Sequence, residues 1–107
     1  MVIDTESVQA AIRDVAKANG ARLALLFGSY ARGTATRRSD VDVIFVEQTS
    51  ARFLDRLAKY FDPLSERLAA PVEVFVYTPD EFRRMRDGFF LRRALSEGIT
   101  VYEHGKL

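Results

Sequence analysis

The sequence predicts an α/β (α+β) fold in which a mixed four-stranded sheet is packed with helices. Two observations predict this class. Some segments repeat apolar residues every three or four positions, as one face of a helix does, whereas others are continuously apolar, as buried strands are. The two kinds of segment alternate along the chain, which indicates helices that connect and cover strands. Because no repeat or low-complexity segment interrupts the 107 residues, we expect one domain over residues 1–107.

The first predicted element is an amphipathic helix followed by a strand. Asp4 or Thr5 can cap the start of the helix, and Asn19-Gly20 supplies a left-handed stop. The continuous apolar run over 23–27 then predicts the first strand. The apolar stripe of the helix has the spacing of one helical face and consists of Val8, Ala11, Ile12 and Val15.

A polar segment separates the first strand from the second. Residues 28–40 are rich in glycine, serine, threonine and arginine, and they predict a loop. The second strand begins near Asp40 and runs to Val46, and a third is predicted over 72–77. Because both are apolar on both faces at most positions, we expect both to be central strands.

The remaining segments predict three helices and a short last strand over 99–103. One helix starts at about Ser50, and Pro63 must kink or restart it because proline has no N–H to donate. Thr78 and Glu81 fit a capping box at the start of the next helix, and a further helix ends at Gly98. The face of the Ser50 helix that we expect to enter the core carries Phe53, Leu57, Phe61, Leu64 and Leu68.

The composition excludes several classes of function. A net charge of +1 argues against nucleic-acid binding through bulk charge. The absence of cysteine excludes disulfide scaffolds, thiolate zinc sites and cysteine nucleophiles. The single histidine, His104, excludes a multi-histidine metal site, and it could join a Ser-His-Asp triad only if the tail folded inward. No segment resembles a signal peptide or a membrane span, so we expect a cytoplasmic protein with no membrane partner.

Three carboxylates interrupt strands that are otherwise apolar. Asp40 and Asp42 begin the second predicted strand, and side chains two apart on a strand share a face. Glu73 stands between two valines in the third strand. If these strands are neighbours, the carboxylates converge, and a hard cation such as Mg²⁺ or Mn²⁺ would relieve their repulsion. Taken singly, an Asp-x-Asp pair is more often a cap or a solvated strand end, and a strand glutamate usually faces solvent.

The Gly28-Ser29 pair follows the first strand directly. A glycine and a small hydroxyl residue at a strand-to-helix turn let backbone N–H groups approach a phosphate closely. Arg32, Arg37 and Arg38 lie in the same segment and could contact phosphates. Each of these features alone is an ordinary turn or a surface arginine. Their occurrence beside the carboxylates favours a site for a phosphate and a metal ion.

These motifs together resemble a known family. Gly28-Ser29, ten intervening residues and Asp40-Val41-Asp42 fit the G-S-x10-D-x-D signature of the polymerase-β-like nucleotidyltransferase superfamily. The stretch GSYARGTATRRSDVDVIFV is similar to the minimal, or MNT-type, nucleotidyltransferases, among them the MntA-type antitoxins of HEPN/MNT toxin–antitoxin pairs. The segment ALSEGITVYE resembles the end of these short domains. The resemblance implies a polymerase-β-like nucleotidyltransferase fold.

The resemblance also implies a two-metal nucleotidyl transfer with ATP as substrate. Gly28 and Ser29 would hold the triphosphate, and the arginine that follows the motif, at position 32, would contact a phosphate or support the loop. Asp40 and Asp42 would bind two Mg²⁺ ions, or Mn²⁺. Glu73 would bind the catalytic metal and help to deprotonate the acceptor hydroxyl. Many relatives carry aspartate at this third position, so Glu73 keeps the charge but has a longer reach.

The same resemblance implies a protein partner. MNT-type proteins are often encoded with a small helical HEPN-domain protein, and they act as antitoxins by adding AMP to a tyrosine of that toxin or by blocking it. One alternative is a catalytically weak antitoxin that neutralises its partner by contact. For this role, Phe89-Phe90-Leu91 could form an exposed apolar patch, unless Phe89 or Phe90 packs into the core. A stand-alone transferase for a small molecule is the other alternative, and a homo-oligomer stays open.

Overall fold

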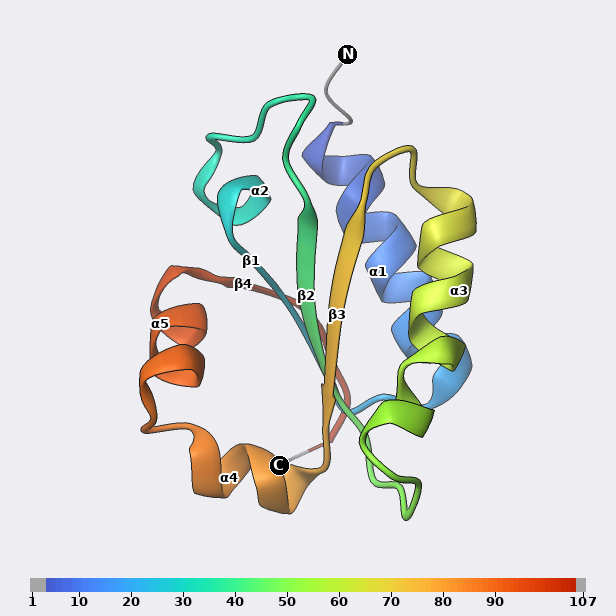
Figure 1. Cartoon of the computed structure of the whole chain (residues 1–107), viewed down its shortest axis with the longest axis vertical. Helices are drawn as coiled ribbons and strands as arrows, with labels where there is room; N and C mark the ends of the chain where they lie inside the picture. The colour runs from blue at the N-terminus through green and yellow to red at the C-terminus, as the bar shows by residue number, and fades with distance from the viewer. Residues whose placement is uncertain (1–3, 106–107) are drawn as a thin grey trace.

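The computed structural model describes residues 4–105, which form one mixed four-stranded sheet with helices on both faces (Figure 1). The strand order is β3-β2-β1-β4. Strands β2 and β3 run parallel, whereas β1 is antiparallel to both β2 and β4. The elements are α1 (Thr5–Asn19), β1 (Leu23–Phe27), α2 (Ser29–Arg32), β2 (Val41–Val46), the short 3₁₀ helix η1 (Leu54–Arg56), α3 (Ala58–Arg67), β3 (Val72–Tyr77), α4 (Pro79–Met85), α5 (Phe89–Glu97) and β4 (Ile99–Glu103).

The two faces of the sheet carry separate hydrophobic layers. One face packs against α1 and α3, with the side chains of Val41, Val43 and Phe45 from β2 at its centre. The opposite face packs against α4 and α5. Because successive side chains on a strand alternate between faces, Asp42 lies on the α4–α5 side together with Ile44. The candidate site therefore belongs to the face that the two C-terminal helices cover.

Caps predicted from the sequence fix the helix ends. The Asp4 carboxylate accepts the backbone N–H of Ser7 at 2.9 Å, so Asp4 is the cap of α1 rather than Thr5. Thr78 and Glu81 form both hydrogen bonds of a capping box at the start of α4. Both predicted caps are therefore confirmed. Each satisfies backbone groups that the first turn of a helix leaves unpaired.

The expectation that β3 is central is wrong, because β3 is an edge strand, paired on one side only with β2. Its apolar residues misled the prediction for a simple reason. Val72, Val74 and Val76 face the layer under α1 and α3, while Phe75 and Tyr77 face the layer under α4 and α5. An edge strand with a helical layer on each face needs apolar residues at both parities, as a central strand does.

The segment predicted as a helix from Ser50 differs from its prediction. The 3₁₀ helix η1 comes first, and α3 begins only at Ala58. Of the five residues expected in the core, Leu64 and Leu68 are buried and Leu57 packs against the core, which confirms those three, whereas Phe53 and Phe61 are exposed. Tyr60 is buried in place of Phe61.

Pro63 does not restart the helix, because α3 continues through it. Proline at position 63 cannot donate to the carbonyl of Lys59, four residues earlier. The side-chain amide of Asn19 donates to that oxygen instead, at 2.9 Å. A residue predicted only as a helix stop therefore also satisfies the backbone group that the proline leaves open.

No helix within residues 4–105 is long and apolar enough to cross a membrane.

Candidate active site

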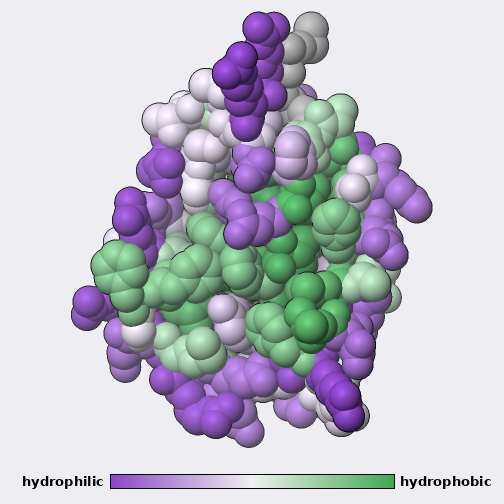
Figure 2. Space-filling view, viewed as in Figure 1, coloured by the Kyte–Doolittle hydropathy of each residue, from purple (hydrophilic) through white to green (hydrophobic). Residues whose placement is uncertain are grey.

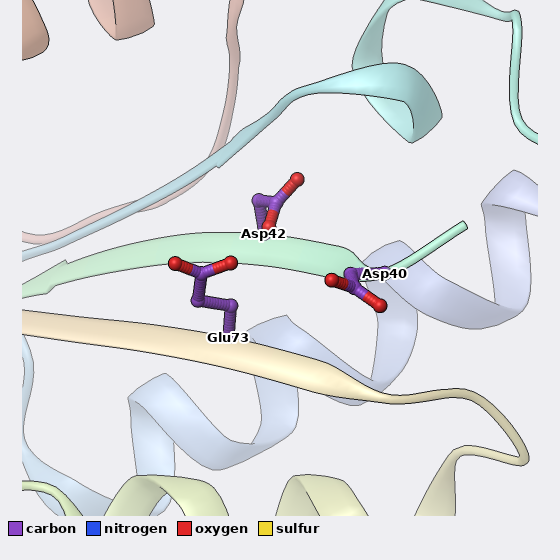
Figure 3. A group of neighbouring side chains, drawn as sticks. All are labelled: Asp40, Asp42 and Glu73. Carbon is purple, nitrogen blue, oxygen red and sulfur yellow. The ribbon is translucent and has the colours of Figure 1, made fainter. Parts of the chain in front are cut away.

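The register of the sheet brings the three predicted carboxylates together. Strand β2 pairs with β3 so that Asp42 lies opposite Glu73, and Asp40 precedes β2 by one residue. One carboxylate oxygen from each residue lies within 4.8 Å of the others. Figure 3 shows the Glu73 side chain reaching from β3 toward β2, where the two aspartates lie. The convergence expected from the sequence is therefore present.

The electrostatics of this cluster are unfavourable without a cation. Burial, followed by the negative charge of Glu73 and a hydrogen bond with it, raises the pKa of Asp42 from 3.8 to about 6. Asp40 adds to this rise, and Arg32 opposes it only in part. A divalent cation would reverse the penalty, because carboxylate oxygens are the ligands that Mg²⁺ and Mn²⁺ prefer. The donor set and the crowding of charge therefore fit a hard metal ion.

Gly28 joins the carboxylates to the end of β1. Phe27, the last residue of β1, pairs with Asp42 across the sheet, so the next residue lies directly beside the carboxylate. The backbone of Gly28 has φ +74°, a conformation that favours glycine, and an added Cβ would overlap the carboxylate oxygen Oδ2 of Asp42. Only glycine fits this position without displacing the acid.

The predicted loop over 28–40 contains a short helix, α2, that the sequence analysis missed. Its four residues are too few to show a helical period, but Tyr30 is buried and anchors them to the core. Ser29 begins this helix, where the first N–H groups have no intrahelical acceptor. Ser29 and Gly28 line a pocket together with Asp42, so the predicted phosphate residues and one predicted metal ligand share a cavity.

Two arginines stand at this pocket and share one carboxylate. Arg32 and Arg93 each lie 3.3 Å from an oxygen of Glu97, and all three residues line the pocket. Neither Arg93 nor Glu97 stands out in the sequence, because both follow the ordinary polar pattern of an amphipathic helix.

The other two arginines singled out in the sequence lie outside this pocket. Arg37 and Arg38 are exposed in a turn in which Ser39 Oγ accepts the N–H of Thr36 at 2.8 Å, and neither lines the cavity. Of the predicted phosphate contacts, the structure places Gly28, Ser29 and Arg32 together.

The pocket has a volume of about 400 Å³. Its lining includes Gly28, Ser29 and Asp42, which we call the polar half, and Phe27, Phe89 and Phe90, which we call the aromatic half. The ion-paired Arg32, Arg93 and Glu97 line the same pocket.

Hydrophobic surface gathers across the middle of the view in Figure 2, with hydrophilic side chains above and below it. Phe89 and Phe90 are 77% and 41% exposed, whereas Leu91 is buried. Of the two possibilities left by the sequence, exposure holds for Phe89, whereas Phe90 is partly covered by Phe27 and Phe75 and Leu91 does not join an exposed patch.

Most of the chain matches a known protein family. Residues 9–101 match the family model described as a nucleotidyltransferase domain. The chain belongs to the nucleotidyltransferase family. A nucleotidyltransferase relative from Methanocaldococcus jannaschii, provisionally named a protein adenylyltransferase, is 30% identical over 78 residues, which cover 73% of this chain and 75% of that protein. The prediction of a nucleotidyltransferase is confirmed.

Two solved structures have the same fold as this nucleotidyltransferase. A chain from the crystal structure of a toxin–antitoxin with AMP-PNP matches 90% of this chain and 73% of its own, with a TM-score of 0.67 and 20% identity. A provisionally assigned nucleotidyltransferase from Sulfolobus solfataricus matches 96% of this chain and 90% of its own, with a TM-score of 0.54 and 19% identity. The predicted polymerase-β-like nucleotidyltransferase fold is thereby confirmed. The family model and the Methanocaldococcus jannaschii relative support the predicted minimal, MNT type.

Proposed function

We propose that this nucleotidyltransferase transfers AMP from ATP to a hydroxyl group, and that the acceptor is a tyrosine of a HEPN-type toxin. One observation carries the proposal: three carboxylates with oxygens within 4.8 Å of one another lie beside Gly28-Ser29, in a chain of the nucleotidyltransferase family. All the described elements form one sheet and its two helical layers, which supports treating residues 1–107 as one minimal domain.

In this proposal the polar half of the pocket binds the triphosphate. The backbone N–H groups at Gly28-Ser29 and the Ser29 hydroxyl would donate to phosphate oxygens, as small residues at a strand-to-helix turn allow. Arg32 lines the same pocket and would add a guanidinium contact. Its ion pair with Glu97 is half-exposed and weak enough to exchange for a phosphate.

Asp40, Asp42 and Glu73 would hold two Mg²⁺ ions, or Mn²⁺. When bound, such ions make the acceptor oxygen more nucleophilic and neutralise charge that develops on the phosphate. The acceptor oxygen forms a bond to the α-phosphorus, and the bond from that phosphorus to pyrophosphate breaks. Glu73 is exposed and would accept the proton of the hydroxyl on a carboxylate oxygen. Its longer side chain still reaches the aspartates, which supports the role that aspartate has in many relatives.

The proposed acceptor rests on the relatives. The Methanocaldococcus jannaschii relative carries a provisional name as a protein adenylyltransferase, and the solved toxin–antitoxin contains AMP-PNP, an analogue of ATP. Both support a protein acceptor and an adenine nucleotide for this chain. An antitoxin that uses ATP would act in the cytoplasm, where ATP is available.

Labelled ATP tests the proposal. The purified chain would be incubated with Mg²⁺, ATP labelled at the α-phosphate and the protein encoded by the adjacent gene. We expect the wild type to label that protein and the Asp40→Ala/Asp42→Ala variant to leave it unlabelled, with the site mapped to tyrosine by mass spectrometry. Equal labelling by the two proteins would refute the catalytic role of the carboxylates.

A contact-only antitoxin is the second candidate, favoured by the 77% exposure of Phe89 at the start of α5. An exposed phenylalanine of this size is available to a protein partner. Toxin neutralisation that survives Asp40→Ala/Asp42→Ala but is lost in Phe89→Ala would establish this function in place of transfer.

A further inference from the structure

We infer that Phe90 is a stacking platform for the nucleobase of the bound nucleotide, an inference that rests on the proposed function. The pocket beside the carboxylates is lined by aromatic residues as well as by the small polar residues proposed to bind the triphosphate. A volume of about 400 Å³ lies within the range of small-ligand sites. A ligand that carries a flat apolar group attached to its phosphates would match both kinds of lining residue.

The aromatic half of the pocket lies beside the paired strand positions that carry the carboxylates. Phe27 immediately precedes Gly28 and pairs with Asp42, which in turn pairs with Glu73. Residues paired in register point to the same face of the sheet. The aromatic half of the pocket therefore begins at Phe27, level with the carboxylates. It lies one residue away from Gly28-Ser29, where the phosphates are proposed to bind.

Two neighbouring rings hold Phe90 in place. Its ring meets Phe27 edge-on at 5.6 Å, with an angle of 86°, and lies 5.0 Å from the ring of Phe75. Phe75 is two residues beyond Glu73 on β3 and therefore on the same face. With these contacts fixed, Phe90 remains 41% exposed and lines the pocket. The ring is pre-organised, and part of its surface is open to a ligand.

The division of the pocket matches a nucleoside triphosphate rather than a peptide. Its polar half holds small residues and a metal-type carboxylate, and its aromatic half is contiguous with it inside one cavity. A triphosphate bound at Gly28-Ser29 directs the attached nucleoside along the cavity toward Phe90. Bases stack on aromatic side chains regardless of their identity, because every base has a π face. The platform therefore contributes affinity for nucleotides in general, and inorganic triphosphate gains nothing from it.

The test compares ATP with inorganic triphosphate. We expect Phe90→Ala to weaken the binding of ATP with Mg²⁺ about tenfold, within the range measured for base–aromatic stacking, and to change triphosphate binding less than twofold. Phe90→Leu keeps apolar contact with Phe27 and Phe75 but removes the π face, so it should weaken ATP equally. Phe53→Ala is the matched control, since Phe53 is 42% exposed, touches another aromatic ring and lies outside this pocket.

Fluorescence gives an independent readout, because the chain contains no tryptophan. The emission of a Phe90→Trp variant should change when ATP binds with Mg²⁺ and stay constant with triphosphate, while a Phe53→Trp variant responds to neither. Unchanged ATP affinity in Phe90→Ala and Phe90→Leu, or an equal loss for ATP and triphosphate, would overturn the inference. If the wild type binds triphosphate as tightly as ATP, only the inference about Phe90 is overturned. If the wild type binds neither ligand, the proposed function is overturned as well.

Discussion

Strand β2 carries a carboxylate near each end, and the two have opposite environments. Glu47, just beyond the C-terminal end, is 6% exposed, accepts a hydrogen bond from the Tyr60 hydroxyl and lies 2.7 Å from the Lys59 ammonium. Asp42, near the N-terminal end, faces Glu73 instead, and burial together with that charge raises its pKa. The fold gives one acid two compensating partners and places the other beside a like charge, as the proposed metal site requires. On this proposal, Glu47 is a structural carboxylate and Asp42 a functional one.

The largest expected difference is in activity. Asp42→Asn removes a carboxylate from the proposed metal site and should lower the initial rate of AMP transfer about 100-fold or more, the usual cost of losing a group that stabilises developing charge. Glu47→Gln lies at the other end of β2 and should stay within twofold of the wild type. The rate of label incorporation into the acceptor measures both. Similar losses of transfer rate in the two variants would contradict the proposed difference in role between Asp42 and Glu47.

The next effect is a loss of stability at the structural acid. Glu47→Ala leaves the buried Tyr60 hydroxyl without its acceptor, and we expect it to cost about 2–3 kcal/mol of unfolding free energy. Urea denaturation would measure this cost. A Glu47→Ala/Tyr60→Phe double variant should lose less than the sum of the single variants, because the two side chains act as a pair. Additive losses would show that the hydrogen bond contributes nothing of its own.

Asp42→Asn should have the opposite sign in metal-free protein. Because folding raises the pKa of Asp42 from 3.8 to about 6, the carboxylate costs stability at pH 7; this cost shrinks as the pH falls from 6 toward 3.8 and is lost below that value. We expect the variant to be about 1 kcal/mol more stable at pH 7, well below the full shift, because solvent screens the half-buried site. Thermal unfolding in a chelator at pH 7 and pH 4 tests this, and a gain as large at pH 4 as at pH 7 contradicts the titration.

The smallest effect is expected at Lys59. Its ammonium is half-exposed, so the ion pair with Glu47 is partly screened. Lys59→Met should cost about 0.5 kcal/mol, because the Tyr60 hydrogen bond remains. Urea denaturation of Lys59→Met and of Glu47→Ala, measured together, ranks the two contacts by their contribution to the free energy of unfolding. A loss as large as that of Glu47→Ala would make the ion pair, rather than the tyrosine, the main stabilising partner.

Much of the fold was predictable, because local signals are strong where hydrophobic period and caps agree. Strand β1 and helix α5 have the bounds expected from their apolar runs and flanking glycines. The edge position of β3 was not predictable, since helices on both faces give an edge strand the composition of a central strand. The exposure of Phe53 and the burial of Tyr60 were not predictable either, because no residue pattern near Phe53 indicates the 3₁₀ turn that precedes α3.

The candidate site was predictable where a residue type contradicts its surroundings. Asp42 and Glu73 stand out as charges in apolar strands, and the parallel register joins them. Arg93 and Glu97 could not be found in this way, because charged residues on the exposed side of a helix are ordinary. Their place at the pocket depends on how α5 crosses the sheet, which is a tertiary property.

Binding of ATP with Mg²⁺, followed by calorimetry, tests the central claim most directly. The claim is that the Asp42 cluster is left uncompensated so that it can hold the metal ions of a bound nucleotide. Wild type and Glu47→Gln should bind ATP only when Mg²⁺ or Mn²⁺ is present, and Asp42→Asn should lose this metal-dependent binding. Metal-dependent binding that is equally tight in Asp42→Asn would contradict the account.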